Sequence, residues 1–284
     1  MLTSLLILTA PAVQAPSREA PLLVTTEWLA ANLATPKLVI FHIGDQRTRS
    51  TYDAGHIPGA QFLNPFTDLS APPSDSGLRL ELPTAEHFDS VLEARGVSDD
   101  SRIILVMSNE YYTPTSRSLF ALEYAGLRGR VSILDGGLEA WKAEGRAVTA
   151  DVPVVTRGSF TPRLRRELVV DADWLKTRIE TPGLALIDAR DTTFFRGAET
   201  RQGRNGRIPG ATNVPFYTVV AGGKFKDPAT LREMLVAAGA APDRTVVTYC
   251  HIGQQASFVW LAARLAGFDP KLYDGSFQEW ARRR

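Results

Sequence analysis

The stretch Thr245-Val246-Val247-Thr248-Tyr249-Cys250 is followed by the loop His251-Ile252-Gly253-Gln254-Gln255 and by a helix-like stretch at residues 256–266. An apolar, β-branched run that leads directly into a helical stretch predicts a buried strand, a short loop and a helix. At such a turn, backbone N–H groups and the positive end of the helix dipole face whatever occupies it. An anion is favoured there, so we expect the thiol of Cys250 to be ionised and reactive.

The loop after Cys250 has the composition of an anion-binding nest. Gly253 can adopt backbone angles that other residues avoid, which lets the loop turn its amides inward, and no residue of the loop is acidic. We therefore interpret residues 251–255 as a loop that binds an anion. A lone cysteine is also often a small buried hydrophobe at a strand end, and the flanking pattern by itself leaves that alternative open.

The chain contains two copies of one pattern, in the same order. The matching segments are residues 24–29 with 170–175, 57–60 with 208–211, 116–126 with 257–267, and 135–141 with 274–280. Four ordered matches indicate a duplicated domain, and about 120 residues per copy is enough to bury a core. We expect domains at residues 21–147 and 168–284, joined by a linker at 148–167.

Short apolar runs alternate with longer amphipathic ones in each copy. The apolar runs are residues 38–41, 103–107, 131–134, 184–187, 245–249 and 271–273, and the amphipathic stretches include 85–95 and 231–238. This alternation predicts an α/β fold in which each domain is a mostly parallel sheet flanked by helices. Ligands of such sheets bind beyond the carboxyl ends of the strands, and Cys250 lies at such an end.

Composition limits the classes of partner and site. The formal net charge is +1, so no strong global field favours nucleic acid. The single cysteine excludes an intramolecular disulfide and a multi-cysteine metal site, and we expect neither a metal nor a cofactor.

The N-terminus has features of a signal peptide. The apolar stretch at residues 2–10 is too short to span a bilayer, and Val13-Gln14-Ala15 resembles a signal-peptidase site, although no lysine or arginine precedes the stretch. We expect residues 1–20 to be a signal peptide for export to the periplasm. The alternative is a disordered start of a cytoplasmic protein. No membrane span is expected.

Taken together, the tandem halves, the Ile-Pro-Gly-Ala elements at 57–60 and 208–211, the Asp-Gly-Gly and Asp-Gly-Ser turns with a nearby tryptophan, and the single cysteine loop resemble the two-domain rhodanese family. The resemblance covers residues 21–284 and implies two tandem rhodanese-like domains. It also implies a sulfurtransferase in which Cys250 takes a sulfane sulfur from thiosulfate or 3-mercaptopyruvate as a persulfide. The acceptor would be cyanide, a thiol or a protein, and no cofactor is implied. We expect a monomer, because a duplicated chain can form a two-domain cleft by itself.

The first copy lacks the reactive residue. The match of residues 116–126 with 257–267 places Asn109 opposite Cys250. An amide cannot be the nucleophile, and the run 109–114 has no glycine and carries Glu110, which repels an anionic donor. We expect the first domain to be catalytically silent and to close one side of the site.

Anionic donors require cations near the cysteine. Arg190 follows the first predicted strand of the second half, and Arg196 and Arg204 belong to an arginine-rich stretch after it, so these three are the candidate donor-binding residues. The family often places a donor-binding arginine where this chain has Phe194. This departure makes thiosulfate, or a protein or glutathione persulfide, a better candidate donor than 3-mercaptopyruvate.

Two further side chains lie beside the predicted loop. Asp188 is assigned a structural role, as a partner of backbone amides or of Arg190. His251 either donates a hydrogen bond or positive charge to a bound oxyanion at mildly acid pH, or points to solvent.

Other functions that use a reactive cysteine fit less well. A cysteine-dependent phosphatase closes its loop with an arginine six residues after the cysteine, where this chain has Ala256, and no papain-like signature surrounds Cys250. A persulfide carrier or redox-responsive binding module remains open, because it needs the same activated thiol as the enzyme. An inactive scaffold is the third alternative.

Overall fold

The computed structural model describes residues 19–109, 112–201 and 203–283. Nearly all of the expected signal peptide at residues 1–20 lies outside them, as does Glu110, so export and the repulsion by Glu110 stay predictions. In the described part of the chain, no helix is long and apolar enough to cross a membrane.

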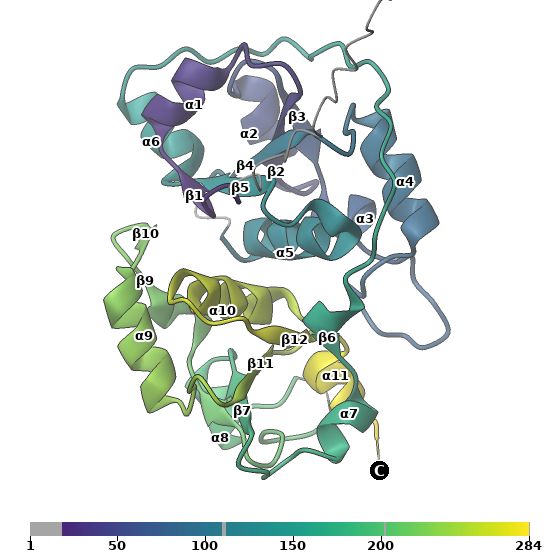
Figure 1. The fold of residues 1–284 in the computed structure, drawn as a ribbon, viewed down its shortest axis with the longest axis vertical. Coiled ribbons are helices and arrows are strands. Elements are labelled where there is room, and N and C mark those ends of the chain that lie inside the picture. Colours follow the sequence, from purple (N-terminus) through teal and green to yellow (C-terminus); the bar gives the residue numbers. More distant parts are fainter. Residues whose placement is uncertain (1–18, 110–111, 202, 284) are drawn as a thin grey trace, which may run out of the picture.

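Two five-stranded parallel sheets form the centres of two domains (Figure 1). In spatial order, the first sheet contains β1 (Leu23–Val24), β5 (Val131–Leu134), β4 (Arg102–Val106), β2 (Leu38–Ile43) and β3 (Ala60–Leu63). The second contains β6 (Val169–Val170), β12 (Lys271–Tyr273), β11 (Thr245–Tyr249), β7 (Leu184–Asp188) and β8 (Thr212–Asn213). The strand order is the same in both, which confirms the predicted duplication and the α/β class.

Helices cover both faces of each sheet. Those of the first domain are α1 (Thr26–Asn32), α2 (Arg49–Ala54), α3 (Pro65–Asp68), α4 (Ala85–Ala94), α5 (Tyr112–Leu122) with the π-helical turn η1 (Glu123–Leu127), and α6 (Gly137–Ala143). The second domain has η2 (Arg166–Leu168), α7 (Ala172–Lys176), α8 (Thr192–Arg196), η3 (Phe216–Val219), α9 (Pro228–Ala237), α10 (Gln254–Leu265), α11 (Ser276–Trp280) and an antiparallel hairpin of β9 (Val220–Ala221) and β10 (Lys224–Phe225).

Matching sequence motifs form matching local structures. Thr25 accepts a hydrogen bond from the backbone N–H of Trp28 at 3.2 Å and so caps α1. Asp171 accepts one from the N–H of Trp174 at 2.7 Å and caps α7 in the same way. Each cap satisfies a backbone donor that the first helical turn cannot pair.

The two domains meet along α5 and α10, which lie side by side (Figure 1). Equivalent residues touch across this contact: Ser116 and Ser257 share a hydrogen bond of 3.2 Å between their hydroxyls, and Glu123 forms an ion pair of 2.6 Å with Arg264. One cluster of buried apolar residues runs through both domains. The domains are therefore packed as a unit, and a site between them has walls of fixed position.

Two segments accompany this contact. Residues 150–165, where the linker is expected, contain neither helix nor strand. Residues 70–84, between α3 and α4, form an extended arm of the first domain. This arm contacts the second domain: the backbone N–H of Leu82 donates to Asp274 Oδ2 at 2.9 Å.

Candidate active site

Cys250 lies directly after β11, as the sequence predicts, and β11 is the central strand of the second sheet. Gly253, the residue just before α10, has φ +87° and ψ −17°, a conformation that glycine adopts without a steric penalty. The first residues of α11 also hold the backbone of Cys250 in place. The backbone N–H of Cys250 donates to Ser276 Oγ at 3.3 Å, and its carbonyl accepts from the N–H of Phe277 at 2.9 Å.

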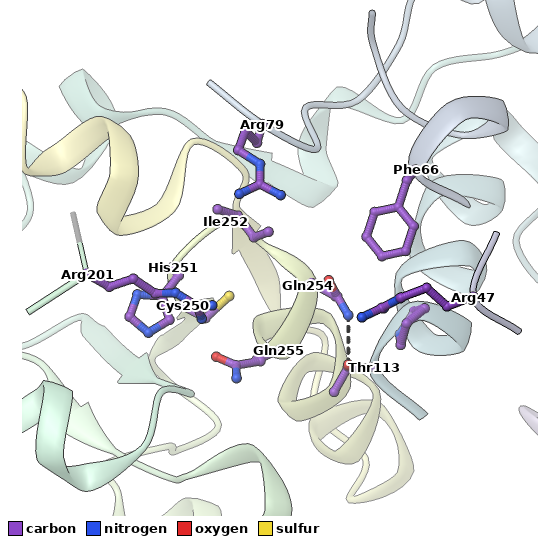
Figure 2. Close-up of a pocket in the computed structure, with 11 residues that line it drawn as sticks. Arg47, Phe66, Arg79, Thr113, Arg201, Cys250, His251, Ile252, Gln254 and Gln255 are labelled. Carbon is purple, nitrogen blue, oxygen red and sulfur yellow. Dashed lines mark hydrogen bonds between the residues drawn. The ribbon is translucent and has the colours of Figure 1, made fainter. Parts of the chain in front are cut away.

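A cavity of about 390 Å³ opens over this loop, and both domains line it. Its lining residues are Arg47, Phe66, Arg79, Thr113 and Pro114 of the first domain and Arg201, Cys250, His251, Ile252, Gln254 and Gln255 of the second. The sulfur of Cys250 points into the cavity (Figure 2). Gln254 closes the contact between the domains, because its Nε2 donates to Thr113 Oγ1 at 2.9 Å.

Burial controls the charge of the thiol. It raises the pKa of Cys250, because removing the sulfur from water penalises the thiolate. The nearby backbone N–H groups of Ala256, Ile252, Gln255 and Gly253 favour the thiolate and lower the pKa, without cancelling the effect of burial. Three of the five predicted loop residues, Ile252, Gly253 and Gln255, therefore contribute amides beside the sulfur, and Ala256 adds a fourth. Because the pKa is raised, the prediction of an ionised thiol is wrong, and the thiol must lose its proton before it can attack.

His251 lines the cavity and is neutral. Burial, with the nearby charges of Arg190 and Arg201, lowers its pKa to about 3. His251 is only 4% exposed, and its ring packs edge-on against Phe194, with ring centroids 4.6 Å apart. The expectations of a positive charge at mildly acid pH and of an orientation to solvent are therefore wrong, while a hydrogen bond from His251 to a bound oxyanion stays a prediction.

Three arginines, Arg47, Arg79 and Arg201, line the cavity within the described part of the chain. Arg47 follows β2 and forms an ion pair of 2.7 Å with Asp45. Arg79 lies in the arm, and its backbone N–H and carbonyl bind the side chain of Gln278 at 3.0 and 2.9 Å. No aspartate or glutamate is among the described lining residues, so the cavity attracts anions.

The arginines that the sequence singled out are placed elsewhere. Arg190 is 2% exposed and pairs with Asp188 at 2.6 Å, which confirms the structural role of Asp188 and removes Arg190 from the donor site. Burial works against the charge of Arg190, but the hydrogen bonds and charge of Asp188 outweigh it, so the pKa of Arg190 is raised. Arg196 and Arg204 are exposed and do not line the cavity. Arg201, from the same stretch, does.

The equivalent position in the first domain holds no reactive group. Asn109 has φ +50°, its backbone N–H donates to Glu139 Oε1 at 2.9 Å, and its side chain donates to Thr51 Oγ1 at 3.2 Å. Among the described residues, no group of three or more histidine, cysteine, aspartate or glutamate side chains is placed to hold a metal ion.

Sequence reasoning missed Arg47 and Arg79, which come from the domain without the cysteine. Arg47 follows the carboxyl end of β2, and that position was a signal that could have identified it. For Arg79 there was no comparable signal, because its place in the cavity depends on how the arm crosses to the second domain.

Comparison with known proteins agrees with this architecture. The rhodanese-like domain model matches residues 25–144 and 171–283. The chain is 35% identical to a probable 3-mercaptopyruvate sulfurtransferase of Pseudomonas aeruginosa, over 91% of this chain and 94% of that protein. It is 31% identical to a putative thiosulfate sulfurtransferase of Mycolicibacterium smegmatis, over 91% and 94%.

Among solved structures, SseA of Escherichia coli, described with the 3-mercaptopyruvate sulfotransferases, superimposes with a TM-score of 0.80 at 30% identity. The match covers 90% of this chain and 98% of SseA. With the family model matched twice and relatives aligned over almost their full length, the chain belongs to the rhodanese family and is a sulfurtransferase built from two tandem rhodanese-like domains.

Proposed function

We propose that the protein is a thiosulfate-type sulfurtransferase with Cys250 as its nucleophile. The observation that carries the proposal is the direction of the Cys250 sulfur, which faces a cavity lined by three arginines and by the backbone amides of its own loop. The arginines attract and orient an anionic donor, and the amides are already aimed at the atom on which negative charge develops.

The first half-reaction forms a persulfide. After losing its proton, the Cys250 sulfur attacks the outer sulfur of thiosulfate; the S–S bond of the donor breaks, and sulfite leaves with the electron pair. The product is a Cys250 persulfide anion, whose outer sulfur remains beside the loop amides. Those amides stabilise it as they stabilise other anions at a helix N-terminus.

The second half-reaction returns the free thiolate. A nucleophilic acceptor, such as cyanide or a thiol, attacks the outer sulfur of the persulfide, and the S–S bond to Cys250 breaks. With cyanide the product is thiocyanate. In this scheme the first domain is catalytically silent, because Asn109 replaces the cysteine, and it contributes Arg47 and Arg79 to the donor cavity.

Thiosulfate is favoured over 3-mercaptopyruvate because of Phe194. Its ring packs against His251 at the position where the family often has an arginine for the donor. The carboxylate and carbonyl of 3-mercaptopyruvate lose a bidentate partner there, whereas the compact charge of thiosulfate needs only cations around the cavity.

Thiocyanate production with each donor, measured in wild type and Cys250→Ser, tests the proposal. We expect turnover with thiosulfate to exceed turnover with 3-mercaptopyruvate and to be lost in the variant. Higher turnover with 3-mercaptopyruvate would overturn the donor assignment. Sulfur bound to Cys250 without turnover would indicate a persulfide carrier. If Cys250 gains no sulfur and no thiocyanate forms, the proposed function is wrong.

A further inference from the structure

Arg117 is a buried cation of the first domain that lies against the catalytic loop of the second. It belongs to α5 and is 1% exposed. Its guanidinium binds the carbonyl of Leu80 in the arm and forms an ion pair of 2.7 Å with Asp274. Its Nη1 lies 3.1 Å from where a Cβ on Gly253 would be, so no side chain separates the guanidinium from the turn that begins α10.

Asp274 links Arg117 to the backbone of Cys250. While Oδ1 of Asp274 faces Arg117, its Oδ2 accepts from the N–H of Leu82 at 2.9 Å. Two residues further on, Ser276 Oγ accepts from the N–H of Cys250 at 3.3 Å, and the next N–H binds the Cys250 carbonyl. A displacement of Asp274 would therefore be transmitted directly to Cys250.

The guanidinium is incompletely satisfied for a purely structural group. Its Nε and Nη1 are buried and have no hydrogen-bond partner in the described part of the chain. Burying unpaired N–H groups costs stability, and a buried ion pair is weak evidence for a stabilising role. A buried Arg117 with unpaired N–H groups therefore indicates a role in positioning its neighbours, Asp274 and Gly253.

We propose that Arg117 is a positioning residue of the active site, through which the first domain fixes the loop after Cys250 by way of Asp274 and Gly253. The inference rests on the proposed function in that Cys250 is the nucleophile whose surroundings are arranged. It gives the first domain a second task besides lining the cavity. Because the loop amides lower the pKa of Cys250, loosening the loop raises that pKa and slows attack by the sulfur at any pH below it, where less thiolate is present.

The ion pair of Glu123 with Arg264 is a matched control. It also joins the two domains, at 2.6 Å, with side chains only 1% and 8% exposed, and neither residue lines the cavity. Glu123→Gln therefore weakens the domain contact without touching the loop. Asp274→Asn is the second test variant, because it keeps the side-chain shape and removes the charge that pairs with Arg117.

Alkylation of Cys250 by iodoacetamide, followed from neutral to alkaline pH on the full-length protein, reports on the loop without any donor. We expect Arg117→Met and Asp274→Asn to shift the profile to higher pH and to slow alkylation at a fixed pH roughly tenfold. We expect kcat for thiocyanate to fall by about 100-fold, the loss that a small misplacement of reacting groups can cause. Arg117→Lys should recover part of both losses.

The control separates positioning from mere stability. Glu123→Gln should lower the unfolding midpoint and leave the alkylation profile unchanged. Equal profiles for Glu123→Gln and Asp274→Asn, or an unchanged profile in Asp274→Asn, would overturn the inference, and this variant decides if Arg117→Met does not fold. If the wild type makes no thiocyanate but Arg117→Met and Asp274→Asn still shift the alkylation profile, the proposed function is rejected and the role of Arg117 is retained.

Discussion

Replacing Gly253 by alanine introduces strain and contact at one defined point of the loop. At φ +87° an alanine costs about 1–2 kcal/mol, and the stiffer unfolded chain offsets roughly 0.4–1 kcal/mol of this. The new Cβ would lie 3.1 Å from Arg117 Nη1 and 3.4 Å from the carbonyl of Asp274. We expect a net loss of about 1 kcal/mol in the free energy of unfolding and, from the shifted loop, about 100-fold in kcat.

Gly145→Ala is the matched control for this substitution. Gly145 has φ +70°, and an added Cβ there meets nothing within 4 Å, so it carries similar backbone strain without the contact. Denaturant unfolding should show similar losses in both variants, whereas thiocyanate production should fall only in Gly253→Ala. Full activity of Gly253→Ala, or an equal fall in Gly145→Ala, would refute the link between loop geometry and catalysis.

Three further outcomes are expected. Arg201→Met should lower kcat/KM for thiosulfate about tenfold, because one charge-assisted contact to the donor is lost. Arg196→Met should lower it less than about twofold, because Arg196 does not line the cavity. Equal effects would contradict the assignment of Arg201 to the donor site. Phe194→Arg should raise the activity ratio of 3-mercaptopyruvate to thiosulfate, and an unchanged ratio would exclude Phe194 as its determinant. Burial lowers the pKa of His42 from 6.5 to about 4. The contribution of neutral His42 to the free energy of unfolding is therefore fully present above pH 6.5 and is lost as the pH falls toward 4. That loss is about 3 kcal/mol. The fall in the free energy of unfolding between these pH values, measured by denaturant unfolding at each pH, should be smaller in His42→Asn than in wild type. Identical falls would contradict this role of His42.

The fold could be predicted because its determinants are local and occur twice. A strand buried on both faces has to be a continuous apolar run, and β11, β5 and β12 have the bounds that their runs predict. In the predicted elements the differences lie at the ends: β2 continues to Ile43, and α10 begins at Gln254, inside the expected loop. The outer strands β1, β3, β6 and β8 were not predicted, because none of them is a long apolar run. The helix begins earlier because Gly253 takes the cap conformation itself.

The site could be predicted only as far as one strand and its loop extend. The position of Cys250 and the inward amides follow from neighbouring residues. The protonation of Cys250 and His251 does not, because it depends on burial by segments far away in the chain. The donor-binding arginines were assigned by proximity along the second half, whereas Arg47 and Arg79 reach the cavity through the packing of the two domains.

The mass of the intact protein after incubation with thiosulfate, without an acceptor, tests the central claim most directly. The account predicts one added sulfur atom on Cys250, its absence in Cys250→Ser, and its removal by cyanide with one thiocyanate formed per sulfur lost. An unchanged mass in wild type, or equal sulfur uptake by Cys250→Ser, would contradict a persulfide on Cys250.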